Sequence, residues 1–349
     1  MANKSYRNLK EEVWEQGLCS GCGACVAVCP ADALHFPALD PGTAPFSPAY
    51  CKEETDGVPC GACVAVCPRT GNRLPKQMLG EYREIWPARA GFDVPRRQSG
   101  GAVTALLSNA LEEGLVDAVV TIAEDRFTLL PRSVVLTSRD ALVHEAGSRY
   151  QWWVPLLASL KEAVVERKYR RVAVIGVPCA IQALRLMKES DHQLVKPFGR
   201  SIRLLLGLFC TETFDYRMLV DEILGKGQGI APWEVKRLDV KGRLEVTLEG
   251  KPAVVLPLKD LEAAVRPGCH ACTDLTSVDA DISAGAVGSP KGYTTLLVRT
   301  AEGKSFVDRA LASGRLEKGD GEVDLAAIEK LAVQKAKRLR TATPTTPKK

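Results

Sequence analysis

Eight of the twelve cysteines in this 349-residue chain lie between Cys19 and Cys67, and this crowding constrains the fold more than any other feature. Residues 1–10 are polar and lack the apolar stretch of a secretory signal, so we expect a compartment that keeps thiols reduced. Residues 18–75 are rich in Cys, Pro, Gly and Ala and show little periodic hydrophobicity. Such a segment cannot close an apolar core alone, which favours metal or cluster ligation over a disulfide framework.

The first four cysteines have the spacing of a bacterial ferredoxin motif. They form the run Cys19-x2-Cys22-x2-Cys25-x3-Cys29-Pro30. Thiolates are the ligands that soft iron–sulfur clusters prefer, and the fourth cysteine of this run ligates the other cluster in two-cluster ferredoxins. A structural zinc site is the alternative, but zinc ribbons use paired Cys-x2-Cys units instead. The spacing therefore predicts iron–sulfur clusters.

An internal repeat supplies the second half of this motif, because the letters of Cys22–Pro30 occur again at Cys60–Pro68. The second copy has Gly57 where a further cysteine is expected, and Cys51 is the candidate replacement. Crossover ligation then predicts two 4Fe–4S clusters, one held by Cys19, Cys22, Cys25 and Cys67 and the other by Cys29, Cys51, Cys60 and Cys63. A three-iron site with Cys51 left free is the alternative.

Beyond residue 80 the pattern changes to alternating strands and helices, which predicts an α/β domain with helices packed on a sheet. Strands are expected at 85–90, 118–122, 134–137, 172–177 and 202–209, and helices at 99–114, 156–167 and 180–188, the first of these with Ser99 as its N-cap. Residues 243–248 and 253–256 suggest an antiparallel insertion. We expect domains at 1–80 and 81–315 and then, within 316–349, a basic helix at 324–340 and a disordered tail.

Charge and hydropathy argue against nucleic-acid binding and against a membrane-spanning segment. A net charge of +5 is too mild to indicate nucleic acid, and no apolar run reaches the length of a membrane span. The basic stretch that starts at Lys335 is expected to be a solvated helix end, with steering of an anionic partner or membrane surface as the alternative.

The remaining cysteines allow two interpretations. Cys179 and Cys210 each follow an apolar strand, where open α/β sheets place ligands, and Cys269-His-Ala-Cys272 adds a chelating pair. Together they can build a third cluster. A lone cysteine after an apolar strand is, however, commonly just buried, and spacing alone does not separate the two.

Seven motifs in order resemble one family. They are Arg97-Gln-Ser99-Gly100-Gly101-Ala-Val-Thr104, Gly147-Ser-Arg149-Tyr150, Gly176-Val-Pro-Cys179, Gly207-Leu-Phe-Cys210, Cys269-x2-Cys272-x-Asp274, Asp281-Ile-Ser-x-Gly285-x-x-Gly288 and Val298-Arg299-Thr300. Across about residues 81–300 the chain resembles the beta subunits of coenzyme F420 hydrogenases and dehydrogenases. Its fused ferredoxin segment looks most like the input subunit of F(420)H(2) dehydrogenase.

The resemblance implies bound FAD, a third 4Fe–4S cluster on Cys179, Cys210, Cys269 and Cys272, and hydride exchange with coenzyme F420. The candidate FAD-binding residues are Arg97, Ser99, Gly100, Gly101, Thr104, Arg149 and Tyr150. A glycine pair entering a helix lets the backbone approach a pyrophosphate at the helix N-terminus, although such a pair is more often an ordinary turn. Arg149 and Tyr150 are a surface pair in the alternative interpretation.

Two departures from the family pattern concern the two-electron partner. Ser99 stands where many F420-specific members have an acidic residue, and Ala286 stands where many members have Asp. Both bear on the identity of that partner more than on the flavin.

The function that follows is a subunit of an F420-dependent oxidoreductase. We expect it to pass single electrons through three 4Fe–4S clusters to partner subunits in an anaerobic cytoplasm, with or without peripheral attachment to a membrane complex. The alternatives are an F420-reducing beta subunit of a hydrogenase or formate dehydrogenase, a related flavin–iron–sulfur reductase with another substrate, and an electron-transfer adaptor without a substrate.

Overall fold

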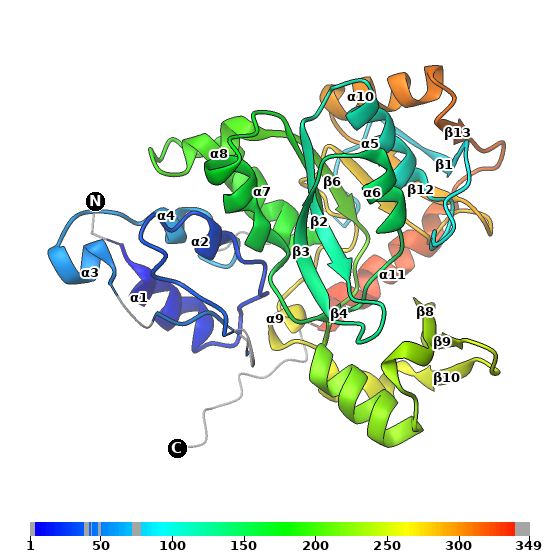
Figure 1. Ribbon diagram of the computed structural model, residues 1–349, viewed down its shortest axis with the longest axis horizontal. Coiled ribbons are helices and arrows are strands. Elements are labelled where there is room, and N and C mark those ends of the chain that lie inside the picture. Colours follow the sequence, from blue (N-terminus) through cyan, green and yellow to red (C-terminus); the bar gives the residue numbers. More distant parts are fainter. Residues whose placement is uncertain (1–3, 38–41, 43, 48–49, 72–77, 339–349) are drawn as a thin grey trace.

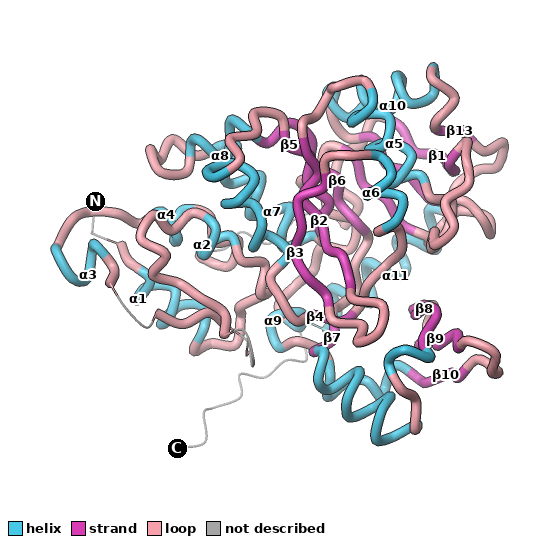
Figure 2. The backbone as a smooth tube through the Cα atoms, in the orientation of Figure 1, coloured by secondary structure: helices cyan, strands magenta, loops and turns pink. Residues whose placement is uncertain are grey.

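The computed structural model describes residues 4–37, 42, 44–47, 50–71 and 78–338 (Figure 1). Strands are concentrated in an α/β body, whereas the N-terminal segment consists of short helices and loops beside it (Figure 2). The expected mixed α/β class is confirmed. We call residues 4–71 the ferredoxin segment and residues 78–338 the body.

Within the described residues, eight strands of the body form one mixed sheet in the order β13-β1-β12-β11-β6-β5-β2-β3. The strands are β1 (Glu84–Ala90), β2 (Ala118–Glu124), β3 (Pro131–Leu136), β5 (Val172–Gly176), β6 (Ile202–Leu208), β11 (Ile282–Gly285), β12 (Thr294–Val298) and β13 (Leu316–Lys318). Strands β2, β5, β6 and β11 are parallel neighbours, so their carboxyl ends meet at one edge. Because β13 pairs with β1, the sheet continues past residue 315.

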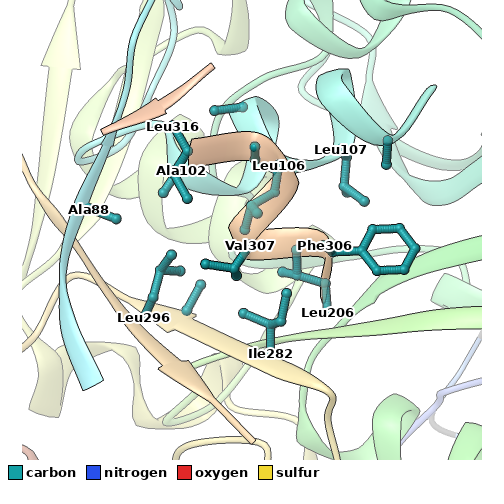
Figure 3. Close-up of a cluster of buried hydrophobic side chains, with 14 of the residues drawn as sticks. Ala88, Ala102, Leu106, Leu107, Leu206, Ile282, Leu296, Phe306, Val307 and Leu316 are labelled. Atoms are coloured by element: carbon teal, nitrogen blue, oxygen red, sulfur yellow. The ribbon is translucent and has the colours of Figure 1, made fainter. Parts of the chain in front are cut away.

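One face of the sheet is covered by α5 (Ala102–Glu112), α6 (Arg139–His144) and α10 (Ala301–Ala312). Leu106 and Leu107 of α5 and Phe306 of α10 point into an apolar cluster with strand residues such as Leu296 (Figure 3). The predicted α5 owes its position to this one-sided burial, because its apolar residues recur at helical spacing.

The opposite face is covered by α7 (Pro178–Glu189) and α8 (Lys196–Ser201) together with the turns η2 (Leu156–Ser159) and η3 (Glu162–Glu166). The helix expected at 156–167 is therefore not regular, since it begins as a 3-10 turn and ends as a π turn. Outside partners take its first backbone groups: Leu157 N donates to Cys22 O at 3.1 Å, and Leu156 O accepts from Ser133 Oγ at 2.6 Å.

The expected antiparallel insertion is confirmed and contains one strand more than predicted. It consists of β8 (Val235–Val240), β9 (Arg243–Leu248) and β10 (Val254–Pro257), packed on η4 (Arg217–Gly227), η5 (Pro232–Glu234) and η6 (Leu258–Ala264). A short parallel pair, β4 (Gln151–Trp152) and β7 (Phe214–Asp215), joins the insertion to the body.

The ferredoxin segment contains α1 (Tyr6–Leu9), η1 (Lys10–Trp14), α2 (Ala24–Ala27), α3 (Lys52–Asp56) and α4 (Ala62–Ala65). Its own apolar core consists of Leu9, Val13 and Val64 with neighbouring cysteines. Further apolar residues of α2 and α4, such as Ala27 and Ala62, belong to the core on the α7 face of the body. The segment is thus packed into the body instead of standing apart from it.

Two helices complete the body near the carboxyl ends of the parallel strands. Helix α9 (Pro267–His270) is short, and α11 (Leu325–Arg338) confirms the helix expected at 324–340 as far as residue 338; the remaining tail lies outside the described residues. Ile328 and Ala332 of α11 are fully buried beside Leu275. No helix among the described residues is long and apolar enough to cross a membrane.

Candidate iron–sulfur and flavin sites

The four cysteines of the body line one cavity at the carboxyl ends of β5 and β6. Cys179 lies in the first turn of α7 after β5, and Cys210 follows β6, as expected from the strand pattern. Cys269 lies in α9 and Cys272 directly follows it. All four line the same cavity, which we call the body cavity. The fold therefore brings together cysteines that are far apart in sequence.

Two cationic side chains also line the body cavity. Lys335, from α11, is 3% exposed and its Nζ donates to Cys210 O and Asp274 O, both at 2.6 Å. Arg69, from the ferredoxin segment, is 9% exposed, and its guanidinium lies against the Cys272 thiol. The interpretation of Lys335 as part of a solvated helix end is wrong, because apolar neighbours of α11 turn this residue toward the interior.

The pKa values of the cavity side chains reflect their mutual positions. Burial raises the pKa of Cys179 to about 12. For Cys272 burial acts in the same direction, but the charges of Lys335 and Arg69 outweigh it and lower the pKa. For Lys335 burial disfavours the ammonium, yet the facing Cys272 and Cys210 raise its pKa. The buried Lys335 ammonium and a Cys272 thiolate thus stabilise each other.

The donor set of the body cavity fits a 4Fe–4S cluster. Four thiols suit iron–sulfur coordination, and a cluster with four thiolates carries net negative charge that buried cations offset. Apart from Cys272, the Nε, Nη1 and Nη2 atoms of Arg69 have no hydrogen-bond partner among the described residues, so this side chain has capacity for an anionic group. Among those residues, no three His, Cys, Asp or Glu side chains converge closely enough for a single metal ion.

A second cavity, in the ferredoxin segment, is lined by Cys29, Cys51, Cys60 and Cys63. This is the set expected from crossover ligation. Helix α3 occupies the lengthened spacing between Cys51 and Cys60, and Cys60 N donates to Glu53 Oε2 at 2.8 Å. Cys51 therefore lies with the other three thiols.

The remaining four cysteines of the segment are also close together. Burial raises the pKa of Cys25, and the next contributions come from Cys22, Cys19 and Cys67. Burial likewise raises the pKa of Cys67 to about 12, with Cys22 and Cys19 adding to it. The thiol of Cys67 thus lies near those of the first repeat, as crossover ligation requires.

The ferredoxin segment contacts the body directly beside these cysteines. Cys22 lines the body cavity as well as belonging to the first repeat. Trp152 Nε1 donates to Gly21 O at 3.2 Å, and the Arg266 guanidinium lies 3.5 Å from the centre of the Trp152 ring. A Cβ at Gly268 would lie 2.1 Å from Cys19 O, so the two backbones touch there.

The body also contacts the other cavity of the segment. Lys161 Nζ donates to Cys29 O at 2.7 Å, and His192 Nε2 lies 2.9 Å from Cys60 O. Side chains of the body therefore hold the backbone at both repeats.

The glycine pair before α5, Gly100 and Gly101, differs from the expectation in which residue caps the helix. The N-cap of α5 is Gly101, in the left-handed region at φ 74°, so the assignment of Ser99 as N-cap is wrong. Ser99 Oγ instead pairs with Thr294 Oγ1 at 2.8 Å, and Gly100 N donates to the same hydroxyl at 3.0 Å. A Cβ at Gly100 would lie 2.2 Å from Ala88 O, so its close approach is to β1.

The helix N-terminus itself still fits an anionic group. No side chain caps α5, so its first-turn amides have no acceptor supplied by a capping residue. Exposed Arg97 lies beside Gly101, its Cδ 3.3 Å from where a Cβ would be. Thr104 is buried within α5. Gly101 and Arg97 thus form the part of this loop suited to a pyrophosphate.

Arg149 and Tyr150 are half-buried, with the Arg149 side chain only 8% exposed, so they do not form an open surface pair. Arg149 Nη1 donates to Glu145 O at 2.7 Å and to Gly147 O at 2.9 Å. Burial raises the pKa of Tyr150 to about 12, and its hydroxyl accepts from Gln98 Nε2 at 3.4 Å. Arg149 thus holds the backbone at Glu145 and Gly147, and Tyr150 contacts the side chain of Gln98, next to the glycine pair.

Comparison with known proteins decides the family. The beta-subunit model of coenzyme F420 hydrogenase/dehydrogenase matches residues 85–161 with its N-terminal part and residues 169–324 with its C-terminal part. The chain belongs to this family. A 4Fe–4S dicluster domain model matches residues 18–71.

Relatives match almost the whole chain. It is 42% identical to an uncharacterized protein of Methanocaldococcus jannaschii, over 97% of this chain and 98% of the other. It is 30% identical to one of the subunits of the F(420)H(2) dehydrogenase of Methanosarcina mazei, over 85% of this chain and 83% of that protein. A chain in the structure of the F420-reducing [NiFe] hydrogenase complex from Methanosarcina barkeri matches with a TM-score of 0.69 and 32% identity, over 77% of this chain and 93% of that one.

Proposed function

We propose that this family member is an iron–sulfur flavoprotein subunit that exchanges a hydride between coenzyme F420 and FAD and passes single electrons to partner subunits. Three 4Fe–4S clusters, at the body cavity and at the two cysteine sets of the ferredoxin segment, carry the electrons. The observation that carries this proposal is Cys22, which belongs to the first repeat and also lines the body cavity.

The contact at Cys22 supports a direct route between two of the sites. Gly21 and Gly268 have no side chain to separate the backbones that carry Cys22 and Cys269. Trp152 and Arg266 fix this contact by a hydrogen bond and a cation–π interaction. The residues that hold each cluster are thereby held at constant relative positions, which single-electron transfer needs more than it needs acid–base groups.

On the flavin side, Gly101 and Arg97 hold the FAD pyrophosphate in this proposal, while Tyr150 contacts Gln98 of the loop that presents them and Arg149 holds the backbone just before Tyr150. FAD supplies the conversion between two-electron and one-electron chemistry when bound. For each hydride taken from reduced F420, two electrons leave one at a time and one proton is released. The balance is the same in the opposite direction, in which the chain reduces F420 as a hydrogenase or formate dehydrogenase subunit does.

Anaerobic stopped-flow mixing with reduced F420 tests this proposal. We expect flavin absorbance to bleach first and cluster absorbance to follow, in the full-length protein loaded with FAD and iron. Bleaching by dithionite without any response to reduced F420 would favour a pure electron-transfer adaptor or a reductase with another substrate.

The partners in this proposal are F420 and the redox subunits of a larger complex in the cytoplasm, with or without peripheral membrane attachment. Purification from the native host, with identification of co-purifying subunits, tests this part. A chain that purifies from the native host without any redox subunit would contradict it.

A further inference from the structure

We infer that Lys335 and Arg69 are positioning residues that set the reduction potential of the cluster in the body cavity. This inference rests on the proposed function, since it presupposes that cluster. It assigns a redox role to two side chains that lie outside the ligand set, one on the C-terminal helix and one in the ferredoxin segment.

The placement of Lys335 is specific. Its side chain comes from the body's last described helix and is 3% exposed, while Lys330 and Lys337 of the same helix are exposed. Its Nζ donates to the carbonyl of one candidate ligand, Cys210, and to that of Asp274, which follows Cys272 closely in sequence. An ammonium held against two carbonyls in a cavity lined by thiols keeps its charge fixed beside them.

Arg69 approaches the same thiols from the other side of the interface. It directly follows the second repeat, Cys60–Pro68, yet it lines the body cavity and its guanidinium lies against Cys272. Its nitrogens have no oxygen or nitrogen partner among the described residues. A buried guanidinium is costly unless negative charge offsets it, and the thiolates of a bound cluster supply that charge.

The expected effect on the reduction potential follows from the positive charge of both side chains. Reduction adds one electron to the cluster, and a nearby positive charge stabilises the more negative reduced form. Both cations therefore raise the potential of the body cluster.

Redox titration followed by EPR tests the inference on the full-length, reconstituted protein. The signal of the body cluster is identified as the one that Cys269→Ala with Cys272→Ala removes. We expect Lys335→Met to shift this signal to lower potential and Lys335→Arg to restore it. Lys337→Met makes the same change of net charge at an exposed position of α11 and should leave the potential unchanged.

The outcomes distinguish failure of the proposed function from failure of this inference alone. Absence of any signal that the double cysteine variant removes would overturn the body cluster, and this inference with it. A signal present in wild type but with unchanged potential in Lys335→Met, or shifted equally in Lys337→Met, would overturn the inference alone. If Lys335→Met cannot be isolated with its cluster, Arg69→Gln against Arg69→Lys decides by the same criterion.

Discussion

The ferredoxin segment and the body both assemble sets of four cysteines, but they do so by different means. In the segment the thiols come from two local repeats, each with a short helix that starts after a left-handed glycine, Gly23 or Gly61, both at φ 82°. In the body the thiols come from segments far apart in sequence, which the parallel sheet brings together. The spacing of the cysteines along the sequence therefore determines the sites of the ferredoxin segment. The topology of the sheet determines the site in the body, whose lining also includes the charged side chains of Lys335 and Arg69.

The two regions also differ in what stabilises them. The body has apolar layers on both faces of its sheet, but the segment has only a small core of its own and shares its remaining apolar residues with the body. The segment therefore depends on its clusters and on docking, as expected for a small unit with few buried side chains.

The largest expected effect is a loss of iron from the body cavity that leaves the two cysteine sets of the ferredoxin segment intact. Cys269→Ala with Cys272→Ala should remove about four of about twelve irons per chain, because two of four ligands are lost. Both ferredoxin-type EPR signals should persist. His270→Ala, between the two cysteines, is the control and should keep all the iron. An unchanged iron content in the double variant would mean that these cysteines are simply buried and hold no cluster.

A second variant tests whether the local repeats are interleaved. Cys67→Ala should damage the cluster held by Cys19, Cys22 and Cys25, whereas Cys29→Ala should damage the one held by Cys60 and Cys63. EPR of each variant distinguishes the two signals, with a loss of between about one and four irons. If each variant damages the cluster of its own sequence neighbours, the crossover assignment is wrong.

The flavin loop provides a test within the body. Gly101→Ala places a Cβ 3.3 Å from Arg97 Cδ and forces an L-residue to remain at φ 74°, so we expect the protein to purify with its iron but with little FAD. Gly114→Ala at φ 63°, at the other end of α5 and with open space around it, imposes comparable backbone strain. Equal flavin content in the two variants would place the pyrophosphate elsewhere.

The smallest expected effect concerns the contact between the regions. In Gly21→Ala, a Cβ would lie 2.7 Å from Arg266 Nη2 and 2.8 Å from Trp152 Cζ2. In Gly57→Ala, a control in the same segment, it would meet nothing within 4 Å. Both substitutions place an L-residue in the left-handed region, which lowers the free energy of unfolding by about 1–2 kcal/mol. The first should lose a further ~1–3 kcal/mol through overpacking, measured as a lower thermal midpoint. Equal midpoints would mean that docking tolerates this contact.

Sequence reasoning extends furthest where the chemistry is local. The run that begins at Cys19 and the substitute position of Cys51 follow from spacing, and the strand ends before Cys179 and Cys210 follow from apolar periodicity. Nothing in the sequence around Arg69 or Lys335 distinguishes them from solvated basic residues, because their burial depends on contacts between distant parts of the chain. Ser99 has the composition of an N-cap, but a hydroxyl on a neighbouring strand, that of Thr294, pairs with it instead.

The shared lining of the body cavity has a consequence for how the protein is made. Ser20, Cys22 and Arg69 form part of the wall on the side of the ferredoxin segment. For the cluster proposed at that cavity, we therefore expect insertion before the ferredoxin segment docks, so that the interior site is filled first and the segment closes it afterwards.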